Sequence, residues 1–268
     1  MAFITKMNII FSLILIIIIC IASGEFVRSN QEGFWHFFPF WRHKIFANSK
    51  TIYTPLTAID SQPNTPGIYY IETLQGGTTV NQLPNIDIRP GSNTILAFTI
   101  DYNGQTSGNW TQIIGVTGRP DGSDHRYLAV WFCPNSTTLH IRTATAGNTN
   151  NNISDCQYAL SPGTHRITII GNSDPNSGNQ TYTVYDRIGG SVNIVAQNVS
   201  LPPQADENGK NYFNYNDKRL YIYSSFGYDH TSKQGNRVYE VVLVTSKNKY
   251  TLTDADNILS DLKANITN

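Results

Sequence analysis

Glutamate is scarce in this chain of 268 residues, which contains only Glu25, Glu32, Glu72, Glu207 and Glu240. None of them has a second carboxylate two or four residues away in a predicted strand, so the chain lacks the paired carboxylates that glycoside hydrolysis requires. A Gly-x-Ser-x-Gly motif and a glycine-rich phosphate-binding loop are also absent. We therefore expect no enzymatic activity, and we interpret Glu240 as an outward-facing polar residue of the last strand.

Charge is scarce as well. Charged residues make up 14% of the chain, and 19 basic residues balance 19 acidic residues. No run or stripe of basic residues is present, whereas nucleic-acid binding depends on such a patch. We therefore exclude nucleic acid as a partner.

Cysteine occurs three times, and the first copy lies in an unusual N-terminus. Residues 9–22 form an apolar run behind Lys6, and small residues follow it, which is typical of a signal peptide covering residues 1–24. The run is shorter than the roughly 20 apolar residues that a membrane-spanning helix needs. We expect a secreted, extracellular protein; the alternative is an uncleaved anchor that holds an extracellular domain at the membrane.

Removal of residues 1–24 would leave two cysteines, Cys133 and Cys156. In an oxidising compartment we expect them to form a disulfide, which would stabilise the fold by about 3 kcal/mol in a loop-entropy model. Two free thiols are the alternative. Two cysteines without a nearby histidine pair do not complete a tetrahedral metal site.

Secretion would also allow N-glycosylation. Six Asn-x-Ser/Thr sequons are present, although the composition alone would give roughly five by chance. Two of them lie between Cys133 and Cys156, where glycans would crowd the surface, so we do not expect that segment to form the binding face. The sequons are at Asn109, Asn135, Asn152, Asn179, Asn198 and Asn265.

Residues 25–65 differ from the rest because seven aromatic residues fall within residues 34–46, around Pro39. This extension either caps an apolar sheet edge or contacts a membrane interface, where tryptophan, phenylalanine and cations are favoured.

Residues 66–252 predict an all-β domain, because short β-branched and aromatic runs alternate with turn residues. The Gly189-Gly190 pair indicates a hairpin. Residues 253–268 predict a short helix capped by Thr253, Asp254 and Asp256. The ten predicted strands are residues 67–73, 94–101, 110–116, 126–132, 137–143, 164–171, 180–186, 191–197, 218–225 and 238–245.

The succession of strands resembles the laminin G-like, concanavalin A-like jelly-roll domains of the lectin and glucanase superfamily. The resemblance covers residues 67–246 and rests on soft strand patterns rather than on ligand side chains. It implies a sandwich of two antiparallel sheets that binds ligands at rim loops or on a concave sheet face, and it implies no single activity. The matching runs are residues 95–100, 110–114, 126–132, 138–141, 163–169 and 182–185.

Calcium is the only cofactor that we consider, because related laminin G-like domains often bind it through an aspartate and loop carbonyls. Two loops are candidates, one with Asp121 and Asp124 and the other with Asp174 and Asn176. Neither matches an established calcium loop in full, and ordinary Asp/Asn turns are the alternative for both. No cofactor is required.

Our candidate ligand-binding surface combines polar and aromatic residues from loops without sequons. We expect a non-catalytic recognition domain that binds an extracellular glycan or protein there. The alternatives are a divergent glycoside hydrolase-like enzyme or lyase, and a structural surface or matrix protein held by an uncleaved anchor. The histidines show no metal-binding spacing, so we expect satisfied or exposed imidazoles. The surface residues are Asp121, Asp124, Arg126, Tyr228, Asp229 and His230.

Overall fold

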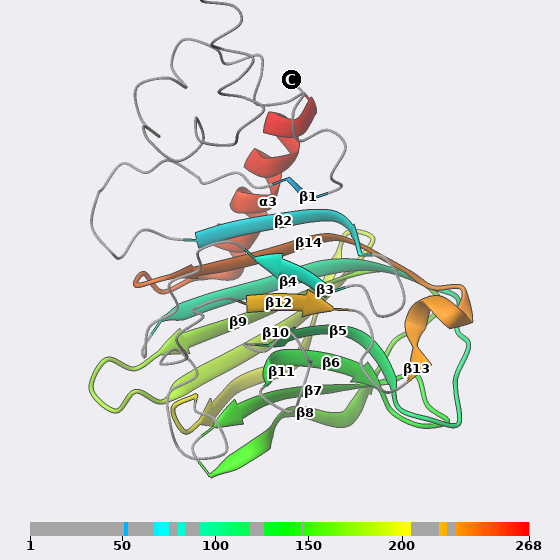
Figure 1. Ribbon diagram of the computed structural model, residues 1–268, viewed down its shortest axis with the longest axis horizontal. Coiled ribbons are helices and arrows are strands. Elements are labelled where there is room, and N and C mark those ends of the chain that lie inside the picture. The colour runs from blue at the N-terminus through cyan, green and yellow to red at the C-terminus, as the bar shows by residue number, and fades with distance from the viewer. Residues whose placement is uncertain are drawn as a thin grey trace, which may run out of the picture. The chain divides into compact units, whose positions relative to one another are not determined.

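A computed structural model of the chain describes eight segments (Figure 1). All of them belong to one compact unit, Lys50–Asn268. The expected signal peptide at residues 1–24 and the aromatic segment at residues 34–46 lie outside the described residues. Within the described part, no helix is both long and apolar enough to cross a membrane. The described segments are residues 51–52, 67–74, 80–83, 92–117, 126–145, 147–204, 220–223 and 229–267.

Seven strands form the first sheet, and every neighbouring pair in it is antiparallel. Strand β1 comes from the predicted N-terminal extension and lies at one edge, and β11 lies at the other. In spatial order the strands are β1 (Thr51–Ile52), β2 (Gly67–Leu74), β14 (Arg237–Ser246), β4 (Asn93–Tyr102), β9 (Gly163–Ser173), β10 (Gln180–Ile188) and β11 (Ser191–Leu201).

The second sheet contains six strands on its main path, again antiparallel. A short additional strand, β13 (Asp229–His230), pairs in parallel with the beginning of β5. The spatial order is β3 (Val80–Leu83), β12 (Leu220–Tyr223), β5 (Thr111–Thr117), β6 (Arg126–Phe132), β7 (Thr138–Thr145) and β8 (Asn148–Ala159). The predicted two-sheet antiparallel jelly-roll sandwich is confirmed.

All ten predicted strands are present within a few residues of their expected bounds, and Gly189-Gly190 forms the turn between β10 and β11 with Gly189 at φ 55°. Four described strands were not predicted: β1, β3, β8 and β13. The omission of β8 matters most, because its Asn-rich sequence suggested a loop whereas it forms an edge of the second sheet.

The core lies between the two sheets, and alternation within strands selects the residues that enter it. In β6, Leu128, Val130 and Phe132 belong to this core, as their spacing predicted. Tyr127 enters the core as well, although alternation alone would turn it outward. A register shift between β5 and β6 at this point explains the exception, because a bulge reverses the side-chain alternation.

Helix α3 (Leu252–Thr267) packs on the outer face of the first sheet, where Ala255, Leu259 and Leu262 join a second apolar cluster (Figure 1). The helix begins earlier than predicted. Thr251, not Thr253, is the N-cap: Asp254 N–H donates to its Oγ1 at 3.3 Å, and the Asp254 carboxylate accepts from Thr251 N–H at 2.7 Å. This reciprocal pair satisfies two backbone donors that the helix itself leaves unpaired.

Glu240 stabilises the contact between the helix and this sheet. It lies at a register shift in β14 with φ 51°, and its carboxylate contacts Thr99 Oγ1 at 3.1 Å and Lys263 Nζ at 2.6 Å. The predicted direction, away from the inter-sheet core, is confirmed. The side chain is nevertheless only 20% exposed, because α3 covers that face.

A buried ion pair lies within the first sheet and is hydrogen-bonded to the second sheet. His165 on β9 and Asp186 on β10 are each 1% exposed, and His165 Nδ1 contacts both carboxylate oxygens at 2.9 Å. His165 Nε2 lies 2.8 Å from the carbonyl of Ser161. Since both ring nitrogens face acceptors, both must donate, and the imidazole is therefore charged. Tyr158 of β8, in the other sheet, donates to Asp186 Oδ2 at 3.0 Å.

Candidate functional site

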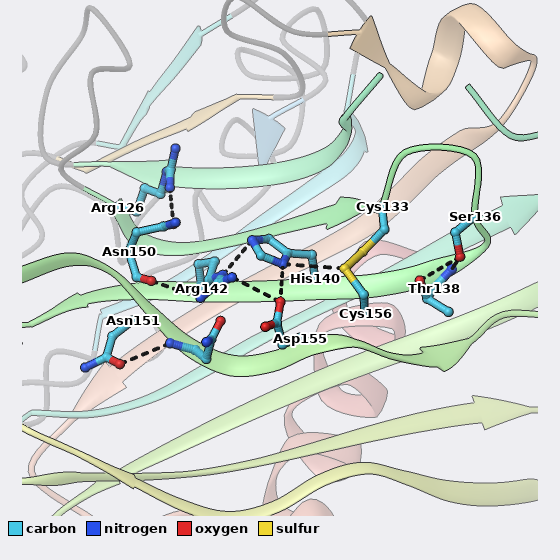
Figure 2. A network of polar contacts seen from close by, with 11 residues as sticks. Arg126, Cys133, Ser136, Thr138, His140, Arg142, Asn150, Asn151, Asp155 and Cys156 are labelled. Atoms are coloured by element: carbon cyan, nitrogen blue, oxygen red, sulfur yellow. Dashed lines mark hydrogen bonds and ion pairs between the residues drawn. A yellow bond between two sulfur atoms is a disulfide. The ribbon is translucent and has the colours of Figure 1, made fainter. Parts of the chain in front are cut away.

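Strand register places a row of polar and aromatic side chains across the outer face of the second sheet. Trp131 on β6 pairs with His140 on β7, and His140 pairs with Asp155 on β8. Paired residues of antiparallel strands project from the same face. The neighbours of Trp131 and His140 in sequence belong to the inter-sheet core, so this row faces away from the core. Arg142, two residues after His140, joins it (Figure 2).

A hollow of about 260 Å³ lies over this row. Its floor is buried: the exposed fractions are 3% for Trp131, 6% for His140 and 9% for Arg142. Its walls are more accessible and come from the segment before β5, from the start of β6 and from β8. The lining residues are Trp110, Arg126, Trp131, His140, Arg142, Asn150 and Asp155.

Arg142 organises the floor of the hollow (Figure 2). Its guanidinium donates from Nε to His140 Nε2 at 2.5 Å, from one terminal nitrogen to the Asn150 carbonyl at 3.0 Å, and from the other to Asp155 Oδ1 at 3.1 Å. His140 Nε2 must therefore accept, which leaves the proton on Nδ1, 3.1 Å from Asp155 Oδ1. The network fixes one neutral tautomer of His140.

Aromatic contacts hold the remaining side chains. The rings of Trp110 and Trp131 lie 4.5 Å and 5.8 Å from the His140 ring, measured between centroids. The Arg126 guanidinium lies 4.7 Å from the centre of the Trp131 ring, a cation–π arrangement, and also donates to Asn150 Oδ1. Packing therefore orients both the floor and the walls before any ligand arrives.

Burial lowers the pKa of His140 to about 4, and the positive charge of Arg142 acts in the same direction. Asp155 opposes this shift through its charge and its hydrogen bond. At neutral pH His140 is uncharged and both of its nitrogens are engaged. It is suited to rigid positioning rather than to exchanging protons with a substrate.

Substitution of Arg142 tests this electrostatic account. In Arg142→Leu, the pKa of His140 is expected to rise from about 4 toward its ordinary value of about 6.5, because the nearest cation is gone and Nε2 loses its donor. NMR titration of the His140 ring protons measures the shift. Arg142→Lys retains the charge and should keep the pKa closer to that of the native protein. An unchanged pKa in Arg142→Leu would contradict the assigned role of Arg142.

The predicted disulfide between Cys133 and Cys156 is confirmed, with a Cα–Cα distance of 6.0 Å. It lies at the edge of the site, because Cys156 follows Asp155 and its Sγ is 3.8 Å from His140 Nδ1 (Figure 2). The two sulfur atoms and His140 lie within 4.8 Å of one another. Because the sulfurs are bonded to each other, they offer no thiolate to a metal ion.

The candidate surface inferred from sequence is only partly described. Arg126 is in the hollow, but its backbone pairs with Thr117 at the end of β5. The backbones of Asp229 and His230 pair with Thr111 and Gln112 at the beginning of the same strand, so the structure does not bring them together with the Arg126 backbone. The other three residues, Asp121, Asp124 and Tyr228, lie outside the described residues.

The second candidate calcium loop is an Asx turn between β9 and β10. Asp174 Oδ1 accepts from Asn176 N–H at 3.1 Å, and Oδ2 accepts from Ser177 Oγ at 2.6 Å. The hydrogen bond from Ser177 is the main cause of a lowered Asp174 pKa. Both carboxylate oxygens of Asp174 thus already accept hydrogen bonds within the loop, and Asn176 is exposed.

Three of the sequons lie in the segments that supply lining residues of the hollow or in a turn that connects them. Asn109 is exposed beside Trp110, Asn152 is exposed on β8 opposite Arg142, and Asn135 is exposed in the turn between β6 and β7. Asn179 ends the β9–β10 loop, Asn198 is exposed on β11, and Asn265 lies in α3. The hollow is lined largely by the disulfide-closed segment, because His140, Arg142, Asn150 and Asp155 all lie between Cys133 and Cys156. The candidate site therefore differs from our expectation that this segment would not form the binding face.

Six residues of the hollow were absent from the predicted site. They are separated by up to 45 positions in sequence and come together only through the register of β5 to β8. A weak signal was present in the polar residues that alternate with Leu139 and Ile141 in β7, and in the carboxylate beside Cys156. The six residues are Trp110, Trp131, His140, Arg142, Asn150 and Asp155.

Comparisons with known proteins identify no family. No family model and no curated protein matches the chain. Among solved structures, it is similar to an alginate lyase from Alteromonas sp. 272, with 10% identity over 75% of this chain and 87% of that one and a TM-score of 0.28. An endo-1,3-β-glucanase from Streptomyces sioyaensis gives 12% identity, 67% and 76% coverage and a TM-score of 0.34.

The lectin UEA-II, in complex with galactose, gives 11% identity over 70% of this chain and 84% of that one, with a TM-score of 0.31. Similarities with TM-scores this low add nothing to what the order of the strands within the two sheets already shows. That order and the antiparallel pairing define the chain as a two-sheet jelly-roll sandwich with one C-terminal helix.

Proposed function

We propose that this chain is a non-catalytic carbohydrate-recognition domain, which binds a sugar residue in the hollow over the second sheet. The observation that carries the proposal is the combination in one place of a buried, hydrogen-bonded floor and an accessible wall of aromatic and polar side chains. The sandwich fold alone supports no particular activity.

The wall matches the chemistry of a sugar ring. A pyranose has apolar C–H faces and a rim of hydroxyl groups. The partly exposed ring of Trp110 offers an apolar surface, Asp155 accepts hydrogen bonds, and Asn150 both donates and accepts them. Asp155 is suited to this role because its side chain is 51% exposed while Arg142 and His140 hold its Oδ1.

The size of the hollow favours a single sugar residue. Its volume of about 260 Å³ is close to the lower end of the usual range for ligand sites, about 300–1,000 Å³. A longer glycan would place one residue in the hollow and extend over the sheet. Because the floor is already ordered, binding would cost little conformational entropy.

Recognition is favoured over hydrolysis by the carboxylates of the hollow. Asp155 is the only carboxylate among the described residues that line the hollow, and it is engaged by Arg142 and His140. Hydrolysis with retention or inversion requires two carboxyl groups, separated by about 5–9 Å. The disulfide supports the further proposal that the protein acts in an oxidising, extracellular compartment.

Glycan-array screening followed by calorimetric titration tests binding, and Trp110 provides the decisive variant. Trp110→Ala is expected to weaken saccharide binding at least about tenfold, equivalent to about 1.4 kcal/mol, because it removes the stacking surface. Trp110→Phe keeps an aromatic face and should retain most of the affinity. Both substitutions preserve the Asn109 sequon.

The proposal fails if no saccharide binds to the folded protein, or if Trp110→Ala binds as tightly as the native chain. Incubation of the native protein with the bound glycans tests the enzymatic alternative. New reducing ends, or the absorbance of an unsaturated product, would contradict the assignment as a non-catalytic domain.

A further inference from the structure

Strand β8 carries a sequon at the wall of the hollow. We infer that an N-linked glycan on Asn152 closes the mouth of the hollow, so that the site is open only in chains that lack this glycan. This inference rests on the proposed carbohydrate binding and extracellular location, and it adds a means by which that binding is regulated.

The first observation is the position of Asn152. Asn150 and Asp155 line the hollow from β8, and Asn152 lies between them in sequence. Asn152 pairs with Arg142 of the floor, and paired residues of antiparallel strands project from the same face. The next residue, Ile153, belongs to the inter-sheet core. Since strand residues two positions apart are separated by about 7 Å, a glycan on Asn152 begins beside the wall of the hollow.

The second observation is that the side chain of Asn152 is available for attachment. Other asparagines of β8 are engaged: the Oδ1 atoms of Asn148 and Asn150 accept hydrogen bonds, and Asn151 Nδ2 donates to Thr145 Oγ1 at 2.9 Å. The side chain of Asn152 is exposed and has no hydrogen-bond partner among the residues that the structure describes. A glycan on its amide nitrogen would therefore break no contact of the fold.

The third observation is the size of the hollow. Its volume is about 260 Å³, and its width from β6 to β8 is two strand spacings, about 10 Å. An N-linked glycan is bulky and contains several sugar residues, so it can extend over this width. It would then cover Trp110, whose ring lies 4.5 Å from the His140 ring in the same hollow.

Burial of the rest of the sequon determines when the glycan can be added. Ile153 is 3% exposed and Ser154 is 6% exposed. An enzyme that must reach the whole sequon therefore acts before β8 pairs with β7. Attachment competes with this pairing and with the disulfide between Cys133 and Cys156, which closes the same segment. Whether the hollow is open or closed is thus set during folding.

Hydroxyl-radical footprinting measures whether the glycan covers the hollow, and it requires no ligand. The protein is secreted from a glycosylating host, and glycopeptide mapping identifies the chains that are occupied at Asn152. We expect Trp110 to be oxidised less in these chains than in Asn152→Gln or Ser154→Ala, which both remove the sequon. Ser154→Ala retains the asparagine, so it separates loss of the glycan from loss of the side chain.

Calorimetric titration measures the effect on binding, with the methyl glycosides of glucose, galactose, mannose and N-acetylglucosamine and their short oligomers as probes. We expect the native protein occupied at Asn152 to bind at least about tenfold more weakly than Asn152→Gln or Ser154→Ala. The matched control is Asn179→Gln, which removes a sequon in the loop between β9 and β10 of the first sheet, outside the lining of the hollow. The control should bind as the native protein does.

The outcomes separate the inference from the proposed function. If Asn152 is bare in the secreted protein, or if the probes bind equally well with and without its glycan, the inference is wrong and carbohydrate binding stands. If the glycan protects Trp110 but no probe binds even the unglycosylated chain, carbohydrate binding is wrong although the glycan closes the hollow. Equally tight binding by Asn179→Gln and Asn152→Gln would also overturn the inference, because glycans at any position would then reduce binding.

Discussion

Replacement of Asp186 with asparagine is expected to lower the free energy of unfolding by about 3–5 kcal/mol, because it leaves the buried His165 imidazolium without its counterion. Both residues are 1% exposed, so water cannot replace the lost contact. The size of the effect also reflects the position of the pair, which joins β9 and β10 and, through Tyr158, the other sheet. Urea unfolding measured at about pH 6 gives the value.

The same pair makes stability depend on pH, and the sign follows from the direction of the His165 pKa shift. Burial lowers this pKa, but the hydrogen bonds to Asp186 and to the Ser161 carbonyl together raise it above the ordinary value. The stabilisation is therefore fully present below about pH 6.5. It is lost as the pH rises through the pKa of the folded state.

We expect the native protein to lose this contribution as the pH rises above about 6.5 and through the raised folded-state pKa of His165, whereas Asp186→Asn should show a flatter profile. Tyr158→Phe is the graded control. It removes one hydrogen bond to the carboxylate and should cost about 1.5–3 kcal/mol, while the pH dependence persists. If Asp186→Asn loses as much stability over this pH range as the native protein does, His165 is not the source of the pH dependence.

Strands with an apolar periodicity could be predicted from the sequence because their local pattern and their final environment agree. In β4, for example, Leu96, Phe98 and Ile100 enter the inter-sheet core, whereas Ile95 and Ala97 lie beneath α3. Each set is apolar because both faces of this sheet are covered. The result is a continuous run of apolar residues, which is readily identified in the sequence as a strand.

Strand β8 could not be predicted in the same way. Its sequence from Asn148 to Ala159 is rich in asparagine, a residue that disfavours strands, and few of its side chains enter the core. Its extended conformation depends on pairing with β7 and on the disulfide, both of which are tertiary contacts.

The residues of the candidate site could not be predicted from any local sequence pattern, because strand pairing brings them together. Trp131, His140 and Asp155 are aligned by the register of three strands, and a shift of one residue would turn any of them to the opposite face. The register shifts between β7 and β8 show that the alignment is not regular even locally. The sequence could indicate that polar residues alternate in β7, but not which residues of β8 would meet them.

Replacement of both cysteines with serine is the second substitution from which we expect a large effect, on stability and on the site together. Cys156 lies on β8, the edge strand, with φ 56°, and follows the residue that forms part of the wall of the hollow. The bridge spans 23 positions, so its loss should lower the free energy of unfolding by about 3 kcal/mol in the loop-entropy model.

Saccharide binding should weaken as well, because β8 pairs with a neighbour on one side only and the bridge fixes the segment that carries Asp155. We expect at least about fivefold weaker binding, equivalent to about 1 kcal/mol, at a temperature where the variant remains folded. Reduction of the native protein with a phosphine should reproduce both effects. Loss of stability with unchanged affinity would mean that Arg142 and His140 alone hold Asp155 in place, and that the disulfide serves the fold rather than the site.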